Sequence, residues 1–277
     1  MRSTIGMLVL GVVLMGCQLG RLTGSEARQA LEETQLAQQA AALTAASVEV
    51  STEFTIGSAV EEAAMEVRDF VHSQLPCAAT TVEGRTVSIE YGAEPGACEF
   101  KGREFSGSHT IEVERTDMHD VLVHHRWDDF SSVNNLTNER IGLQGTADVT
   151  WDFDDRTRRI QHELTWTRQS DGRMGVGGGD RLQQPLAGGV LEGIQIDGQR
   201  TWDGDAGRWS LDIRDVQVRW QDPVPQAGRY DLDTPFDKSV AVEFNRIDDT
   251  TIAVTIEGPR RSFTFNVNQL GVATDAD

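Results

Sequence analysis

The feature that most constrains this chain is an alternation of apolar and polar residues with a period of two. Val87, Ile89 and Tyr91 are apolar, and their neighbours in the sequence are polar. Successive side chains of a strand point to opposite faces, so this pattern is typical of a strand with one buried face. The alternation recurs at Ile111/Val113, Val121/Val123/Trp127, Ala147/Val149/Trp151/Phe153, Ile160/Leu164/Trp166, Trp209/Leu211/Ile213, Val216/Val218/Trp220, Val240/Val242/Phe244, Ile252/Val254/Ile256 and Phe263/Phe265/Val267.

The connections between these segments are short and rich in turn-forming residues. Asp171-Gly172, Asp203-Gly204, Asp248-Asp249 and Gly258-Pro259 are examples. Short connections make successive strands antiparallel neighbours. The sequence therefore predicts a mainly β fold, an antiparallel up-and-down meander that forms a strongly curved sheet or a (half-)barrel. Large aromatic residues at inward positions favour a packed core over an open lipid cavity.

One amphipathic helix is expected to pack on this sheet near its N-terminal end. Ser58 and Glu61 form a capping box, an apolar stripe continues to about Gln74, and Pro76 follows. The alternating segment 48–56 precedes the helix and predicts the first strand. We therefore expect a single β-rich domain over residues 48–270, with a disordered tail at 271–277.

Residues 17–47 differ in composition from the domain. They are rich in Ala, Gln, Glu and Leu, which are good helix formers, but they lack a broad apolar stripe. This composition predicts a helical or disordered tether that is docked weakly or not at all.

The first residues form a short apolar segment that ends at a cysteine. The apolar stretch from Ile5 to Gly16 is shorter than the roughly 20 residues that a spanning helix needs. Leu14-Met15-Gly16-Cys17 resembles the lipobox of bacterial lipoproteins. The resemblance implies that residues 1–16 are a signal peptide, that the Cys17 thiol carries diacylglycerol, and that its amino group receives a further acyl chain such as palmitate. The alternative is an ordinary signal peptide followed by an incidental cysteine.

The body of the chain adds a second, weaker resemblance. The stretch "DPVPQAGRYDLDTPFDKS" (222–239) is similar in texture to uncharacterised lipoproteins of Gram-negative bacteria, a likeness that implies no activity. Gln18, the residue after the anchor, is not the aspartate associated with retention in the inner membrane. The expected location is the cell envelope, with the outer membrane favoured.

Two further cysteines remain once Cys17 is assigned to the lipid. An exported chain folds in an oxidising compartment, so the even remainder, Cys77 and Cys98, predicts a disulfide bond. Such a bond would stabilise the fold by roughly 3 kcal/mol on the chain-entropy model. The alternative is two free buried thiols.

The charge of the chain limits its partners. The formal net charge is −19, which repels phosphate backbones and excludes nucleic-acid binding. We expect the membrane to be contacted through the lipid alone. An envelope protein or a small hydrophobic ligand is the remaining candidate partner.

No catalytic motif is present, and no cofactor is predicted. "HELTW" (162–166) has Trp where a zinc-binding His-Glu-x-x-His motif needs its second histidine. His119, His125 and His162 are the histidine candidates for a metal site, but two imidazoles without a carboxylate are an incomplete set of ligands. The other metal candidate is a weak surface calcium site at "DGDAG" (203–207). "GVGGGDR" (175–181) lacks the Lys-Ser/Thr of a phosphate loop, and its glycines are expected to make room for a cross-strand tryptophan.

These observations favour a lipid-anchored, non-catalytic structural or binding module of the cell envelope. The first alternative is a half-barrel carrier of lipids or other hydrophobic ligands. The second and weaker alternative is a metal-dependent hydrolase that uses the three histidines.

Overall fold

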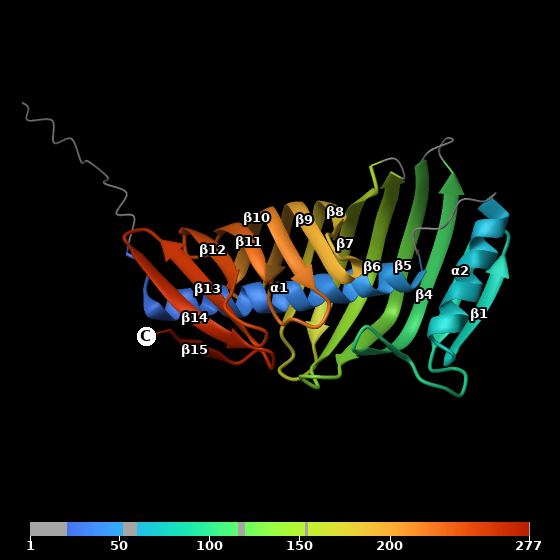
Figure 1. Cartoon of the computed structure of the whole chain (residues 1–277), viewed down its shortest axis with the longest axis horizontal. Helices are drawn as coiled ribbons and strands as arrows, with labels where there is room; N and C mark the ends of the chain where they lie inside the picture. Colours follow the sequence, from blue (N-terminus) through green and yellow to red (C-terminus); the bar gives the residue numbers. More distant parts are fainter. Residues whose placement is uncertain (1–20, 52–59, 116–119, 153–154, 277) are drawn as a thin grey trace, which may run out of the picture.

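A computed structural model describes residues 21–51, 60–115, 120–152 and 155–276. Two helices precede a long series of strands (Figure 1). The helices are α1 (Gly24–Ser51) and α2 (Val60–Gln74). The strands are β1 (Ala78–Glu83), β2 (Thr86–Tyr91), β3 (Glu99–Phe100), β4 (Arg103–Arg115), β5 (Asp120–Asn134), β6 (Arg140–Asp152), β7 (Thr157–Arg168), β8 (Met174–Leu186), β9 (Gly189–Gly204), β10 (Gly207–Arg219), β11 (Ala227–Asp233), β12 (Ser239–Arg246), β13 (Thr251–Gly258), β14 (Arg261–Asn268) and β15 (Ala273–Asp275).

All of these strands belong to one antiparallel sheet. They lie side by side in chain order from β1 to β15, except that β3 pairs only with β4. Figure 1 shows a long, curved sheet with β1 near one end and β15 near the other. Within the described residues the sheet does not close, because β1 and β15 are its edges. The predicted curved meander of the mainly β class is confirmed.

Two bulges at glycines interrupt the regular pairing of the strands. Gly107 has φ +94°, and a Cβ atom there would lie 2.1 Å from the backbone oxygen of Asp129 on β5. Gly228 on β11 has φ +98° and faces Asp215 on β10 in the same manner. Bulges increase local twist and bend a sheet, which helps it to curve around its contents. Because β10 continues through its bulge, the two strands predicted at 209–213 and 216–220 are parts of one strand.

Helix α1 corrects the predicted tether. It runs along the length of the sheet and crosses the strands (Figure 1). Leu22, Leu36 and Leu43 are fully buried, and every residue from 40 to 48 is buried. The C-terminal part of the helix, which is covered on all sides, needs no apolar stripe, and this is why the prediction of weak docking was wrong. Its many alanines let the surrounding elements approach the helix backbone closely.

Two predicted boundaries of the domain also change. The strand expected from Val48 is not formed there, because α1 continues to Ser51; residues 52–56 lie outside the described part of the chain. The alanine-rich helix includes the start of the alternating segment 48–56, and the side chain of Val48 is buried. The predicted tail at 271–277 is wrong for β15, which pairs with Phe265 to Val267 on β14. The described fold thus begins at about Leu22 and includes β15.

Helix α2 covers one end of the sheet, where it contacts β1, β2 and β4. It begins at Val60, and the predicted cap Ser58 lies outside the described residues. Cys77 follows the helix and forms a disulfide with Cys98, with their Cα atoms 5.2 Å apart. The predicted disulfide is present, and it ties the end of α2 to the segment before β3.

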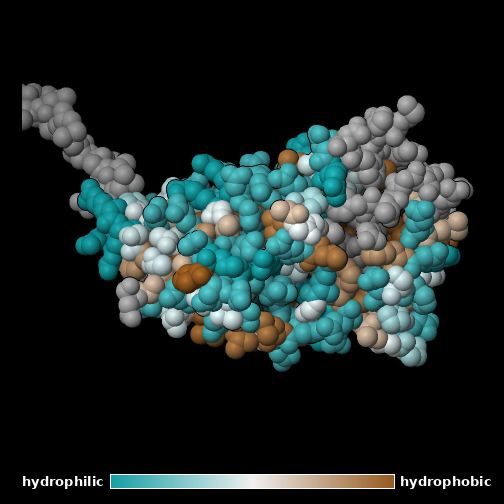
Figure 2. Space-filling view, viewed as in Figure 1, coloured by the Kyte–Doolittle hydropathy of each residue, from teal (hydrophilic) through white to brown (hydrophobic). Residues whose placement is uncertain are grey.

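The interior of the curved sheet is filled with aromatic side chains. Trp127 and Trp209 are fully buried. A Cβ atom at Gly175 would lie 2.2 Å from the ring of Trp166 on the neighbouring strand. The prediction that a glycine of this strand makes room for a cross-strand tryptophan is confirmed at Gly175. On the face shown in Figure 2, hydrophilic side chains cover most of the described surface and apolar ones form separate patches.

Candidate functional site

The predicted metal candidates do not form a common site. His119 lies outside the described residues, as does the predicted lipidation site Cys17. His125 on β5 and His162 on β7 both face inward, but each pairs with Ala147 on the intervening strand β6. Their backbones are therefore about 10 Å apart. Among the described residues, no group of three or more His, Cys, Asp or Glu is placed to hold a metal ion.

His125 is part of a different cluster, which the sequence did not reveal. Its Nδ1 lies 3.0 Å from Nε2 of His109 on β4, and Nδ1 of His109 lies 3.2 Å from the Tyr91 hydroxyl on β2. We call Tyr91, His109 and His125 the histidine cluster. The alternation of His109 with Ile111 and Val113 was the available signal that it points inward.

The histidine cluster is neutral and largely satisfies its own hydrogen bonds. Both imidazoles stack near Trp127, with ring centroids 5.1 Å (His109) and 5.6 Å (His125) away. Burial lowers the pKa of His109 to about 3 and places the pKa of His125 well below its ordinary value. A neutral imidazole carries one donor and one acceptor, so a chain of such rings can pair internally.

A second buried cluster is strongly cationic. Arg158, Arg181 and Arg200 project from the inner faces of β7, β8 and β9, with exposed fractions of 2%, 1% and 8%. We call these three residues the arginine cluster. Arg158 lies opposite Gln183, while Arg181 and Arg200 lie opposite glycines of the adjacent strands. Three adjacent strands thus direct guanidinium groups into one part of the core.

The sequence carries a weak signal that these arginines point inward. Arg158 precedes Ile160 by two positions and therefore falls on the inward stripe. Arg181 continues the inward positions of the glycine-rich strand. Arginine is so rarely buried without a partner that pattern analysis treats it as a surface residue by default.

Aromatic rings and one amide contact two of the three guanidinium groups. The Cζ atom of Arg158 lies 5.2 Å from the ring centroid of Trp151, and that of Arg200 lies 5.9 Å from Trp202. The Nε atom of Arg158 donates a hydrogen bond of 2.7 Å to Oε1 of Gln183. These contacts orient the guanidinium groups of Arg158 and Arg200.

Arg181 is the most isolated cation of the cluster. Its Nε and Nη2 atoms are buried and have no hydrogen-bond partner among the described residues. Burial, together with the charges of Arg200 and Arg158, lowers the pKa of Arg181 to about 9, so it is still protonated at neutral pH. Two carboxylates with buried side chains, Glu33 of α1 and Asp222, are bound to other arginines, Arg173 and Arg246.

The polar groups of α1 nearest the cluster are already used. The hydroxyl of Tyr230, which acts electrostatically on Arg181 and Arg200, donates a hydrogen bond of 3.1 Å to Oε1 of Gln38 on α1. Helix α1 therefore lies against this part of the interior. The arrangement offers many donors and few acceptors.

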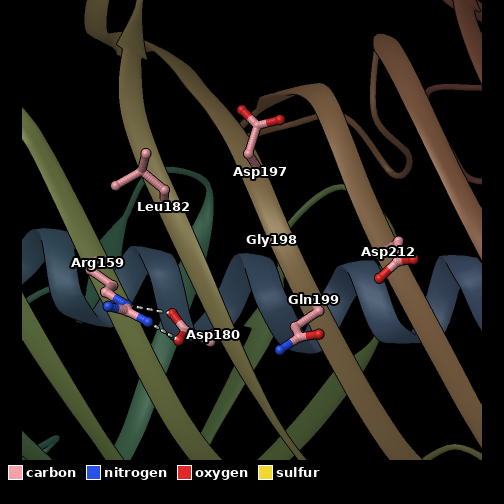
Figure 3. Close-up of a pocket in the computed structure, with 7 residues that line it drawn as sticks. All are labelled: Arg159, Asp180, Leu182, Asp197, Gly198, Gln199 and Asp212. Carbon is pink, nitrogen blue, oxygen red and sulfur yellow. Dashed lines mark hydrogen bonds and ion pairs between the residues drawn. The ribbon is translucent and has the colours of Figure 1, made fainter.

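A depression of about 520 Å³ lies on the opposite, outer face of β7 to β10 (Figure 3). Three of its charged groups have partners: Arg159 pairs with Asp180, and Asp197 accepts a hydrogen bond from the backbone N–H of Asp215. These groups are open to solvent, so they need no ligand for compensation. The depression is lined by Arg159, Asp180, Leu182, Asp197, Gly198, Gln199 and Asp212.

Comparisons with protein-family models, with curated proteins and with solved structures find no match to this chain. In the described part of the chain, neither helix has the length and apolar character needed to cross a membrane. The arguments about function below therefore depend on the residues themselves.

Proposed function

We propose that this protein is a lipid-anchored, non-catalytic binding module of the cell envelope. The observation that carries the proposal is the position of Cys17, the lipobox cysteine, five residues before Leu22. Leu22 is fully buried at the start of the fold. Five residues span at most ~18 Å, so a lipid on Cys17 would hold the domain close to the membrane surface.

Two properties of the domain support an envelope location. The disulfide between Cys77 and Cys98 is typical of proteins that fold in an oxidising compartment. The net charge of −19 disfavours direct docking on anionic lipid head groups, so the acyl chains would provide the attachment. Gln18 after the anchor favours the outer membrane.

The anchor is tested by expressing the full chain with Cys17→Ser in a Gram-negative host. We expect the precursor to remain unprocessed or the domain to appear in the soluble fraction, and incorporation of labelled palmitate to be lost. Gln18→Asp is the matched control: it should keep palmitate labelling and move the protein toward the inner membrane. Membrane association of Cys17→Ser that resists carbonate washing would disprove lipid anchoring.

A half-barrel lipid carrier is the second candidate, and the open curved sheet with a helix along it favours this function. In this structure α1 and the tryptophans occupy the interior, so a carrier would have to move α1 to admit acyl chains. Solvent extraction of protein purified from membranes, followed by mass spectrometry, tests this function. About one non-covalent lipid per protein would support a carrier, and its absence would favour a binding module with a packed core.

A further inference from the structure

We propose that the arginine cluster is a binding site for an oxyanion, a phosphate or a carboxylate group, held between β7–β9 and α1. The proposal concerns the interior of the domain and does not depend on the membrane anchor. It rests on Arg181, whose buried guanidinium has two nitrogens without a hydrogen-bond partner in the described residues.

The first argument is the energetic cost of the uncompensated charge. A buried cation is tolerated when a counter-charge and hydrogen bonds offset its lost hydration. The groups that act on the charge of Arg181 are two more guanidiniums and the Tyr230 phenol. A bound anion would supply the missing counter-charge.

The second argument is the chemistry of the donors. The planar fork of a guanidinium matches the two oxygens of a carboxylate or phosphate and forms paired hydrogen bonds with them. Gln183 adds a buried Nε2 atom that has no partner in the described chain. His162, whose pKa is lowered by burial and then by Arg181 and Arg200, stays neutral and adds no repulsion of its own toward an anion.

The third argument concerns access. Gln38 of α1 is hydrogen-bonded to Tyr230 near the cluster, so the helix covers the site from the side opposite the sheet. An anion held there is shielded from water. Charge-assisted hydrogen bonds are strongest in such a shielded, low-dielectric environment. Its exchange requires α1 to separate from the sheet. The same oxyanion could be a free ion or the head group of a lipid.

The experiment uses the full-length protein purified from membranes, together with two arginine variants. Arg181→Gln removes the isolated guanidinium, whereas Arg159→Gln removes an exposed arginine from the outer face of the neighbouring strand as a matched control. Thermal unfolding is followed in phosphate, in sulfate and in chloride at equal ionic strength. Extracted lipids are quantified by mass spectrometry.

A free oxyanion would raise the Tm of the wild type and of Arg159→Gln by about 5 °C or more over chloride, with no such shift in Arg181→Gln. A lipid head group would instead appear as about one co-purified anionic lipid per protein, lost in Arg181→Gln and retained in Arg159→Gln. Either result supports the site and distinguishes the two sources. A wild type with no anion-dependent Tm and no co-purified anionic lipid would overturn the proposal.

A second variant keeps the test decisive if Arg181→Gln does not fold. Gln183→Glu places a carboxylate at the inward position two residues from Arg181 and opposite Arg158. This internal anion should raise the Tm in chloride and remove the response to phosphate or to lipid. A Gln183→Glu protein that is less stable than wild type and still responds to anions as wild type does would contradict the proposal. Retained membrane attachment of Cys17→Ser with an intact anion response would refute the anchor alone.

Discussion

The histidine cluster and the arginine cluster lie in the same core, on the same face of the same sheet, and differ in one physical respect. Tyr91, His109 and His125 are neutral when buried and hydrogen-bond to one another, which leaves Nε2 of His125 as the one polar side-chain atom of the cluster without a partner among the described residues. Arg181 keeps its charge at neutral pH, and two of its nitrogens have no hydrogen-bond partner among the described residues. Burial alone therefore does not mark a binding site. A buried group that keeps its charge at neutral pH does indicate a binding site.

The largest expected effect tests whether the histidine cluster is structural. Trp127→Ala removes a fully buried ring that stacks on both histidines, and should lower the free energy of unfolding by about 3–5 kcal/mol. Denaturant unfolding at pH 7 measures the loss. Leu182→Ala, which truncates a half-exposed side chain on the outer face, is the control and should change stability by about 0.5 kcal/mol or less. A loss below about 1 kcal/mol for Trp127→Ala would show that the cluster is not packed as described.

The next effect is a dependence of stability on acid that belongs to the histidine cluster. In the folded protein the pKa of His109 is lowered from 6.5 to about 3 and that of His125 also lies well below 6.5. Below pH 6.5 the unfolded chain binds protons that the folded chain does not, so stability is lost as pH falls from about 6.5 toward 3. Protonation of these two histidines in the unfolded chain should lower the free energy of unfolding by about 2.5 kcal/mol between pH 7 and pH 5.5.

Arg181 makes no contribution in this pH window. Its folded pKa of about 9 and its higher unfolded value both lie above the window, so it is protonated in both states. Denaturant unfolding of wild type and of the double variant His109→Phe/His125→Phe across pH 7 to 5.5 is the measurement. The double variant should lose the part of the slope that His109 and His125 contribute and keep the part that comes from His162, whose pKa is also lowered by burial. An equal slope in both proteins would assign it to other groups.

A smaller effect tests the internal pairing of the two imidazoles. His109→Phe leaves Nδ1 of His125 buried without its partner and should cost about 2 kcal/mol at pH 7. The double variant His109→Phe/His125→Phe removes both partners and should recover at least half of that cost. The coupling energy from the double-mutant cycle measures the pair. Additive losses in the two single variants would show that the imidazoles do not interact.

The smallest effect is expected at the arginine cluster of delipidated protein in low-salt chloride. Arg181→Met exchanges an uncompensated cation for an apolar side chain of similar length, and its free energy of unfolding should stay within about 1 kcal/mol of wild type or rise. Urea unfolding after refolding from extracted protein measures this change. A loss of more than about 2 kcal/mol would mean that Arg181 has an internal partner and would remove the contrast between the two clusters.

The strands were predictable because their information is local. Alternation over five or six residues, as in Val240 to Phe244, depends only on which face of a strand is buried. Turn residues such as Asp171-Gly172 add a second local signal. The pairing of Cys77 with Cys98 was predictable by counting. The candidate site was not predictable in this way, because Arg158, Arg181 and Arg200 are separated in sequence and meet only when β7, β8 and β9 pair in register.

Helix α1 shows where the limit of local information lies. The sequence by itself determined that residues 24–51 are rich in helix formers, and it determined the meander that follows them. It did not determine that the sheet curves around this helix, because a helix covered on all sides shows no periodic contrast between its faces. Only the tertiary structure decided that the alanine-rich segment is core, and with it which charged side chains are sealed away from water.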